Sequence, residues 1–261
     1  MSTQRVVRLL LIDIGNTHTH VGLATERRIL KTRDIDTTQV LTGRVGSILA
    51  RFAGERGITA ACLCSVVPQA TQPTQRTLQQ EFGVTALQLT PKTVRGVGIR
   101  YPRPNSIGQD RLANAVAARA AFGAPSVVVD FGTAVTFDVV DAQGDYVGGI
   151  IAPGLAAMTD YLHEKTALLP KIRIHEPGRV IGRNTEEAML IGAVHGYRGL
   201  VRELIGGLKR ELGVRRLPVV ATGGYARLIA RGLPEIDAVR PSLTLEGLRL
   251  TWLSARGSGA V

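Results

Sequence analysis

The stretch from Leu9 to Ala24, which reads LLLIDIGNTHTHVGLA, constrains the fold most strongly. Its four leading aliphatic residues have the length and composition of a buried strand, and the run ends at the carboxylate of Asp13. A second apolar patch, Val21 to Ala24, follows a short polar segment. The simplest structure is a β-hairpin whose tip holds small polar groups. The alternative is an ordinary turn with an exposed aspartate.

The tip of this hairpin contains the residue types of a phosphate site. Gly15 allows the backbone to approach a ligand closely, and Asn16 and Thr17 add donors to the neighbouring backbone N–H groups. An acid at the end of a buried strand, beside such a loop, suits a phosphate that is bound together with a divalent cation.

The same strand–loop–strand unit occurs again at residues 126–140, SVVVDFGTAVTFDVV. When Asp13 is aligned with Asp130, Gly15 falls on Gly132 and the flanking apolar runs coincide. Repetition of a whole supersecondary unit indicates a duplicated fold. The sequence therefore predicts an α/β protein with two related lobes, residues 1–123 and residues 124–261.

Paired Asp-x-Gly hairpins in two lobes resemble the superfamily of actin, the sugar kinases and Hsp70, in which ATP lies in a cleft between two RNase H-like lobes. Within that superfamily, the sequence motifs of the chain resemble those of the type III pantothenate kinases. The matching segments run in family order through most of the chain: DIGNT at 13–17, SVVP at 65–68, YPRPNSIGQDR at 101–111, DFGTA at 130–134, GGIIAPG at 148–154, GRNTEEA at 182–188 and TGG at 222–224.

This resemblance implies ATP-dependent phosphorylation of pantothenate to 4′-phosphopantothenate, the entry step to coenzyme A. It implies that Asp110 is the general base, that Asp13 orients Mg²⁺ directly or through water, and that Asp130 binds a monovalent cation, K⁺ or NH₄⁺. The positions implied for ATP and its phosphates are Asp13, Ile14, Gly15, Asn16, Thr17, His18, Thr19, His20 and Thr133. Those implied for pantothenate are Tyr101, Gly108, Gln109, Asp110, Arg111 and Thr185. Because the family is dimeric, we also expect a homodimer.

Position alone leaves simpler interpretations of three of these sites open. Asp110 falls at the start of an expected helix, where a structural capping aspartate is typical. Asn184 and Glu187 have capping-box spacing, so Thr185 is also consistent with a plain helix start. The turn TGG at 222–224, which the superfamily places near the adenosine, is equally consistent with a tight connection between a strand and a helix.

Other segments have clear local patterns. Apolar residues at helical spacing predict a helix within residues 36–57, and residues 60–67 have the pattern of a buried strand. Residues 71–82 predict a polar helix that Gly83 ends. Gly148 to Gly154 is predicted to be a glycine-rich bend before a helix, and residues 254–261 a frayed tail.

Charge and cysteine content restrict the class of protein further. A net charge of +11 raises the question of nucleic acid, but the 27 arginines and 5 lysines are scattered, which favours a basic enzyme with anionic substrates. Cys62 and Cys64, the only cysteines, are predicted to be buried free thiols because they share one face of an apolar strand. No apolar run reaches the roughly 18 residues of a membrane helix, and the N-terminus has no signal-peptide pattern. We therefore expect a cytoplasmic protein without membrane association.

Two other classes of protein remain as alternatives. The first is another enzyme of the superfamily, such as a sugar or acetate kinase or a polyphosphate hydrolase, against which the segment 101–111 argues. The second is a non-enzymatic accessory factor for transcription, a role described for proteins resembling this family and compatible with the charge of +11. Retention of every expected catalytic position favours the enzyme.

Overall fold

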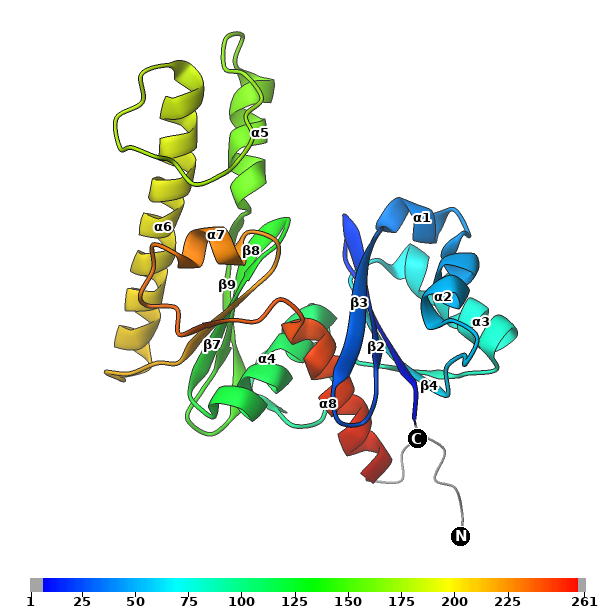
Figure 1. The fold of residues 1–261 in the computed structure, drawn as a ribbon. Coiled ribbons are helices and arrows are strands. Elements are labelled where there is room, and N and C mark those ends of the chain that lie inside the picture. The colour runs from blue at the N-terminus through cyan, green and yellow to red at the C-terminus, as the bar shows by residue number, and fades with distance from the viewer. Residues whose placement is uncertain (1–6, 258–261) are drawn as a thin grey trace. The chain divides into compact units, whose positions relative to one another are not determined.

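The computed structural model describes residues 7–257, which form two compact units (Figure 1). The first unit comprises the chain as far as Ala121 together with the residues from Ser242 onward, and the second comprises Phe122–Pro241. This division differs from the predicted one, which assigned all of residues 124–261 to the second lobe. The physical reason is helix α8 (Leu243–Gly257), which packs on the sheet of the first unit.

The sheet of the first unit has the strand order β3-β2-β1-β4-β5. Its strands are β1 (Leu9–Ile14), β2 (His18–Ala24), β3 (Ile29–Asp36), β4 (Ala60–Ser65) and β5 (Ala86–Gln88). Strand β1 pairs antiparallel with β2 and parallel with β4. The predicted hairpin over residues 9–24 is therefore confirmed, and β1 lies at the centre of the sheet.

Strand β1 is buried on both faces, which explains its unbroken aliphatic run. Its even-numbered residues belong to a core covered by α1 (Thr37–Leu41), α2 (Val45–Ala53) and α3 (Pro68–Phe82). Its odd-numbered residues point to the opposite face. There a Cβ added to Gly22 would lie 3.0 Å from Leu245 of α8 and 3.7 Å from Leu11. Asp13 shares this second face with Leu11.

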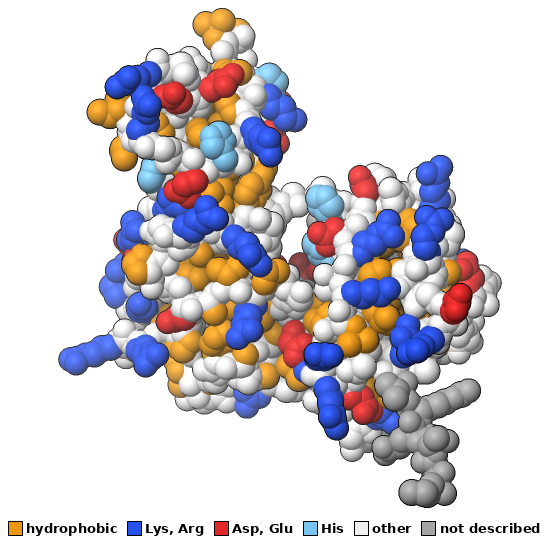
Figure 2. Space-filling view, viewed as in Figure 1, with side chains coloured by type: hydrophobic (Ala, Val, Ile, Leu, Met, Phe, Trp, Pro, Cys, Tyr) orange, Lys and Arg blue, Asp and Glu red, His pale blue; other side chains and the backbone are white. Residues whose placement is uncertain are grey.

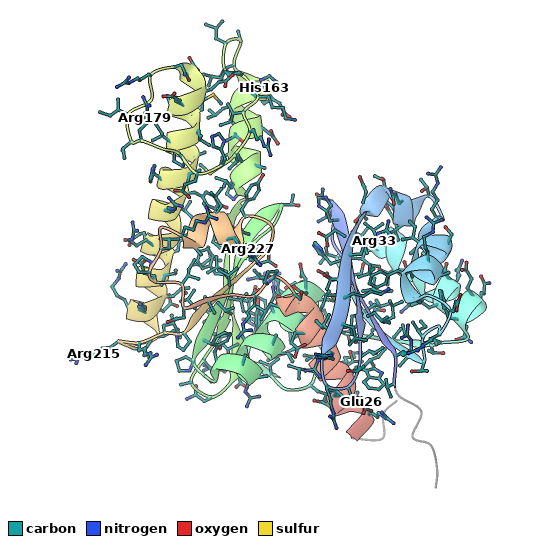
Figure 3. The ribbon with its side chains drawn as sticks, in the orientation of Figure 1. Glu26, Arg33, His163, Arg179, Arg215 and Arg227 are labelled. Carbon is teal, nitrogen blue, oxygen red and sulfur yellow. The ribbon has the colours of Figure 1, made fainter. Side chains whose placement is uncertain are left out.

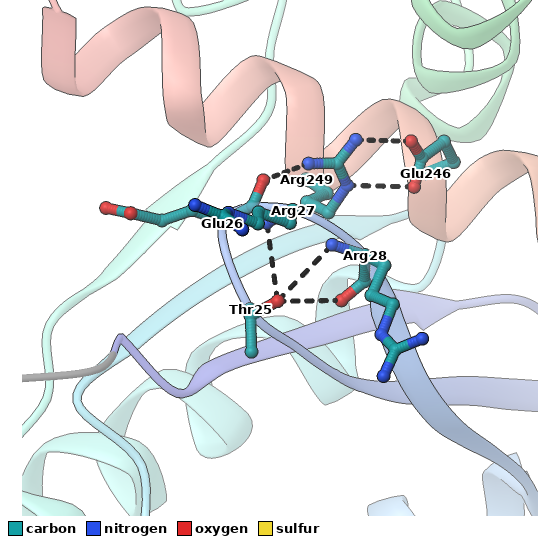
Figure 4. A network of polar contacts seen from close by, with 6 residues as sticks. All are labelled: Thr25, Glu26, Arg27, Arg28, Glu246 and Arg249. Carbon is teal, nitrogen blue, oxygen red and sulfur yellow. Dashed lines mark hydrogen bonds and ion pairs between the residues drawn. The ribbon is translucent and has the colours of Figure 1, made fainter.

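A polar network fastens α8 to the turn between β2 and β3 (Figure 4). The guanidinium of Arg249 donates to both carboxylate oxygens of Glu246, with an Nε–Oε2 distance of 2.9 Å, and to the carbonyl oxygen of Glu26. The hydroxyl of Thr25 accepts from the backbone N–H groups of Arg27 and Arg28 in the turn. Because Arg249 is buried, these bonds fix one register of α8 against the sheet.

The region between β3 and β4 differs from the prediction of one helix within residues 36–57. It contains the two short helices α1 and α2, separated by Gly43 at φ 78°. The predicted polar helix is confirmed as α3, which begins at Pro68 and ends at Gly83 in the left-handed conformation. The first unit also contains the short strand β6 (Gly98–Ile99), a 3₁₀ turn (Pro104–Ser106) and nearly all of α4 (Gln109–Phe122).

The second unit repeats the sheet of the first. Its strands β7 (Ser126–Phe131), β8 (Ala134–Val140), β9 (Asp145–Pro153), β10 (Val219–Thr222) and β11 (Ala238–Val239) lie in the order β11-β10-β7-β8-β9. Strand β7 pairs antiparallel with β8 and parallel with β10, as β1 pairs with β2 and β4. The predicted duplication is therefore confirmed, with Asp130 at the position of Asp13.

Helices of the second unit pack on its sheet and on one another. They are α5 (Leu155–Lys165), α6 (Thr185–Glu211) and α7 (Ala226–Ala230). Apolar side chains of α6 and α7 share one core with β7, β8 and β10, and side chains fill the interior (Figure 3). Figure 1 shows α5 running beside the first half of α6, beyond the sheet.

Two local predictions for this half of the chain were wrong in part. Gly148 to Gly154 is not a bend, because residues 148–153 belong to strand β9. The glycines allow backbone at φ 128° and 159°, beside a register shift in the ladder, without ending the strand. The predicted frayed tail is helical over residues 254–257, and its remaining residues, 258–261, lie outside the described part of the chain. Among the described helices, none is long and apolar enough to span a bilayer.

Candidate active site

The tip of the β1–β2 hairpin is a tight turn that requires glycine. The N–H of Gly15 donates to the carbonyl oxygen of His18 at 3.0 Å, and a Cβ at Gly15 would lie only 2.8 Å from that oxygen. The first residue of α1 braces the tip, since the Thr37 hydroxyl donates to the carbonyl oxygen of Gly15 at 2.8 Å and its N–H donates to that of Thr17 at 3.0 Å. The tip is thus a rigid loop of closely spaced backbone groups.

The residues predicted to contact ATP divide into exposed and buried side chains. Asn16, Thr17 and His18 are exposed at the tip, whereas the side chains of Ile14 and Thr19 are 0% and 1% exposed. The hydroxyl of Thr19 lies 3.0 Å from that of Thr37. These two buried residues therefore have only backbone groups to offer a ligand at the tip.

His20 occupies the next outward-facing position on β2. Its Nδ1 lies 2.7 Å from Asp34 Oδ1 of β3, and its ring lies 6.5 Å from the His18 ring, centroid to centroid. The two imidazoles therefore stand next to each other at the end of the hairpin. Because an ionised carboxylate can only accept, Asp34 orients the His20 ring when Nδ1 carries a proton.

Asp13 is the penultimate residue of β1 and is 7% exposed. In the parallel pairing of β1 with β4 it lies opposite Cys64, whose Sγ donates to Asp13 Oδ1 at 3.2 Å. Cys62 and Cys64 are both free and buried, as predicted. The contact between Cys64 and Asp13 was not foreseen, although the parallel register of the two strands is the signal that would have revealed it.

Asp110 lies in the first turn of α4 and is partly buried. Its Oδ1 accepts from the N–H of Arg111 at 2.8 Å, and a Cβ at Gly108 would come within 2.5 Å of that oxygen. Glycine at position 108 therefore leaves room for the carboxylate. Burial raises the pKa of the Asp110 carboxyl above its usual value, against the opposing effect of the N–H and the charge of Arg111.

The end of β4 links the elements that carry Asp13 and Asp110. Burial raises the pKa of Cys64 well above its usual value, and the charges of Asp13 and then Asp110 raise that pKa further. The hydrogen bonds agree with this arrangement, since Cys64 donates to Asp13 and the next residue, Ser65, donates its N–H to Gln109, which precedes Asp110. The structure thus brings together the predicted base and the predicted cation ligand, which are 97 positions apart in the sequence.

Gln109, predicted to contact pantothenate, is already bonded within the first unit. Its Oε1 accepts from the N–H of Ser65 at 3.0 Å and from Nε2 of Gln88 at 3.4 Å. Gln88 Oε1 in turn accepts from Gln75 Nε2 at 3.1 Å. The backbone N–H of Ser65 identifies the oxygen of Gln109, so this chain of amides ties the start of α4 to the end of β4. The sequence contained no pattern that indicated it.

The second unit places Asp130 beside the turn that follows β10. Asp130 is partly buried and lies opposite Thr222 in the parallel pairing of β7 with β10. Gly223 has φ 88°, and a Cβ on it would lie 2.6 Å from Asp130 Oδ1. Glycine is therefore required at this turn both by its backbone conformation and by the carboxylate beside it.

The tip of the β7–β8 hairpin lies at the start of α5. A Cβ on Gly154, which precedes α5, would lie 2.7 Å from the carbonyl oxygen of Gly132 and would also clash with Thr133. Thr133 itself is exposed at this tip. Small residues on both sides thus let the second Asp-x-Gly loop and a helix start come into contact.

The remaining predicted substrate residues are exposed. Tyr101 is 37% exposed in the first unit, and Thr185 is exposed at the start of α6 in the second. The predicted capping box is confirmed in part: Asn184 Oδ1 accepts from the N–H of Glu187 at 2.8 Å, while Glu187 Oε2 accepts from the N–H of Arg183 at 2.9 Å. Thr185 therefore belongs to a firmly capped helix start.

The donor set agrees with Mg²⁺ bound together with a nucleotide. Among residues 7–257, no group of three or more His, Cys, Asp and Glu side chains is arranged to hold a metal ion. Mg²⁺ is typically bound by one or two carboxylates together with phosphate oxygens and water. Asp13, near the end of β1 beside the hairpin tip, offers a carboxylate of that kind.

Two units that repeat one sheet topology, each with an aspartate at the end of its first strand, define the fold of the actin-like ATPases and sugar kinases. Among solved structures, the chain resembles a Campylobacter jejuni protein assigned by its name to the Baf family of transcriptional activators, with a TM-score of 0.63, 18% identity and coverage of 95% of this chain and 99% of that one. It also resembles a Listeria monocytogenes protein named for N-acetylmannosamine kinase, with a TM-score of 0.52, 12% identity and coverage of 96% and 100%. At these identities the likeness concerns the fold alone.

Sequence comparison identifies the family. The family model of the type III pantothenate kinases matches residues 9–206. The type III pantothenate kinase of Akkermansia muciniphila is 52% identical over 242 residues, which cover 92% of this chain and 96% of that protein. The chain belongs to the type III pantothenate kinase family.

Proposed function

We propose that this protein uses ATP to phosphorylate pantothenate, a reaction of coenzyme A biosynthesis. Membership of the family supports the reaction. The single structural observation that carries the proposal is that the end of β4 bonds both Asp13, through Cys64, and the residue before Asp110, through Ser65, which gives one unit both a candidate cation ligand and a candidate base. Phosphoryl transfer requires alignment, charge neutralisation and a proton acceptor, and little covalent work by the protein.

Asp110 is the proposed general base. It accepts the proton of the pantothenate hydroxyl as the new O–P bond forms, while the bond between the γ-phosphorus and the bridging oxygen breaks and ADP leaves. Its raised pKa supports this role, because a base is most effective when its pKa approaches the working pH. Gly108 leaves space beside the carboxylate, and the N–H of Arg111 holds one of its oxygens.

The proposed phosphate contacts come from both Asp-x-Gly loops. Gly15, Asn16 and Thr17 offer a rigid, exposed loop, His18 and His20 stand beside it, and Thr133 is exposed on the equivalent loop of the second unit. Asp13 would hold Mg²⁺ directly or through water, and the ion would neutralise charge on the phosphates. Ile14 and Thr19 complete the predicted set through their backbone.

Pantothenate is the proposed ligand of Tyr101, Gly108, Gln109, Asp110, Arg111 and Thr185. The guanidinium of Arg111 suits the carboxylate of this substrate, since arginine pairs with planar anions through two hydrogen bonds. The side-chain oxygen of Gln109 already accepts from the N–H of Ser65 and from Nε2 of Gln88. We therefore assign its contact to the amide nitrogen.

Asp130 is the proposed site of a monovalent cation, K⁺ or NH₄⁺. A partly buried carboxylate beside the backbone turn at Gly223 offers the oxygen ligands that such an ion requires. This assignment is independent of Asp110 and is tested by replacing K⁺ with Na⁺.

A homodimer is the proposed assembly, and a second copy of this chain is the proposed cover for an apolar surface of the second unit. The segment from β9 to α6 exposes large hydrophobic side chains: Ile151 at 65%, Tyr161 at 61%, Leu168 at 90%, Val180 at 72% and Ile181 at 82%. Figure 2 shows hydrophobic side chains at the surface of the projection that α5 and α6 form. Exposure of this extent is typical of an interaction surface. Sedimentation should give twice the chain mass of 27.9 kDa.

The cytoplasm is the proposed location, and nucleic acid is not a proposed partner. The two free, buried thiols agree with a reducing compartment. Lys and Arg side chains are spread over the face seen in Figure 2 rather than gathered in one stripe, and a scattered positive charge favours small anionic substrates.

The test is an assay of the purified protein with pantothenate, ATP, Mg²⁺ and K⁺, repeated with Na⁺ in place of K⁺, in which ADP and phosphopantothenate are measured together. Equal amounts of both products, formed only with pantothenate, are expected, with a lower rate in Na⁺. Formation of ADP without phosphopantothenate would refute the substrate assignment.

A further inference from the structure

The end of strand β4 contacts Asp13 and the residue that precedes Asp110. Cys64 is 0% exposed and directly opposite Asp13 in the parallel ladder. The next residue, Ser65, donates its N–H to Gln109, the neighbour of Asp110, at 3.0 Å. Two consecutive residues of one strand thus contact the elements that carry the predicted cation ligand and the predicted base.

The hydrogen bond between Cys64 and Asp13 has a defined direction. An ionised carboxylate can only accept, so the thiol donates its proton to Asp13 Oδ1 across 3.2 Å. Asp13 is itself 7% exposed, and a buried carboxylate relies on protein donors to fix its orientation. The S–H group therefore acts on the orientation of Asp13.

The second unit provides an independent parallel. Asp130, the counterpart of Asp13, lies opposite Thr222 on the neighbouring parallel strand. Thr222 is 2% exposed and, like Cys64, carries a side-chain donor. Both copies of the duplicated unit thus place a buried residue with a donor opposite the aspartate that is the penultimate residue of the first strand.

We propose that Cys64 is a positioning residue for phosphoryl transfer, whose S–H holds the Asp13 carboxylate in the orientation that binds the magnesium complex of the nucleotide. This inference rests on the role proposed above for Asp13. It gives a function to a buried thiol that would otherwise be a packing residue. Cys62, two positions earlier on the same face, lies opposite Leu11 and provides the matched control.

The test compares Cys64→Ala, Cys64→Ser and Cys62→Ala with the wild-type protein. The alanine variant at position 64 removes the donor, and the serine variant restores one. Loss of a weak S–H bond to a charged acceptor should weaken binding of MgADP by about 5- to 10-fold. The KM for MgATP should rise by a similar factor in Cys64→Ala while the KM for pantothenate changes less than about twofold. Cys64→Ser should recover most of this loss, and Cys62→Ala should leave both KM values near those of the wild type.

Calorimetric titration with MgADP separates this inference from the proposed reaction, since it needs no turnover. Thermal unfolding of all three variants should show that substitutions at positions 62 and 64 lower the stability by comparable amounts. A specific loss of MgADP affinity in Cys64→Ala, rescued by serine, supports the inference even if pantothenate proves not to be the substrate. Unchanged affinity in Cys64→Ala, equal loss in Cys64→Ser, equal loss in Cys62→Ala, or no MgADP binding by the wild type would each overturn it.

Discussion

Replacement of Asp110 by asparagine should abolish most turnover and at the same time stabilise the fold. Asparagine keeps the shape of the side chain and an oxygen that can accept from the N–H of Arg111, a bond of 2.8 Å in the wild type. It removes the negative charge, which burial makes unfavourable. The variant therefore separates the catalytic role of Asp110 from a structural role as a capping residue.

The two effects have different sizes and different pH dependence. Loss of a positioned base should lower kcat by about 10²- to 10⁴-fold, equivalent to about 3–5 kcal/mol at 1.36 kcal/mol per tenfold change. Removal of an unfavourable charge from a functional site typically stabilises a protein by about 0.5–2 kcal/mol. Because the pKa of Asp110 is raised in the folded protein, its charge costs nothing below the ordinary pKa of 3.8 and costs most above the folded pKa. The stability advantage of asparagine should thus grow as the pH rises.

The assay combines steady-state kinetics with urea unfolding at pH 5 and pH 8. Asp110→Ala provides the comparison, because it loses both the charge and the bond to Arg111 and should be less stable than Asp110→Asn by about 1 kcal/mol, as for a lost cap. A kcat within about threefold of the wild type in Asp110→Asn would refute the base assignment. A destabilised Asp110→Asn at pH 8 would refute the electrostatic argument.

Three further variants test other parts of the structure. Glu176→Gln weakens the paired bonds of 2.8 and 2.7 Å to buried Arg198. Because the pair is partly exposed, the free energy of unfolding should fall by only about 1 kcal/mol at pH 7. Since those bonds lower the pKa of Glu176, this loss should disappear as the pH falls below 4.5. Gly247→Ala places a Cβ 2.5 Å from the carbonyl carbon of Ala113 in α4, so urea unfolding should show a cost of about 1–3 kcal/mol; a neutral result would contradict the close contact of α4 and α8. Asp130→Ala should reduce the stimulation of turnover by K⁺, and an unchanged ratio of rates in K⁺ and Na⁺ would exclude the cation role.

The sequence predicted the elements whose pattern is local. The unbroken aliphatic runs that end at Asp13 and Asp130 indicate buried strands even though polar and apolar residues do not alternate in them. The repetition of these runs was enough to predict the duplicated fold. The helix start at Asn184 followed from the capping pattern. Asp110 was correctly placed in the first turn of a helix because the glycine- and proline-rich segment before it ends at an amphipathic run.

Features that depend on distant contacts were not predicted. The grouping of α8 with the first unit depends on Leu245 and Arg249 meeting β1, β2 and the turn at Glu26, which no local pattern encodes. The strand over Gly148–Pro153 was mistaken for a bend because glycine is permissive in both structures. The bonds of Cys64 to Asp13 and of Gln109 to Ser65 depend on strand register and on the packing of α4, which a single sequence does not specify.

The position of α8 also has a consequence for how the chain is made. The second unit is continuous in sequence, so all of its residues have been synthesised before α8 is. The first unit cannot complete its fold until α8 is synthesised, because this helix, which covers one face of β1, comes from residues 243–257, whereas β4 ends at Ser65. At about 5–20 residues per second, this interval lasts roughly 10–40 s. During that time the nascent first unit has an uncovered apolar sheet face, and its chaperone dependence during synthesis should exceed that of the second unit.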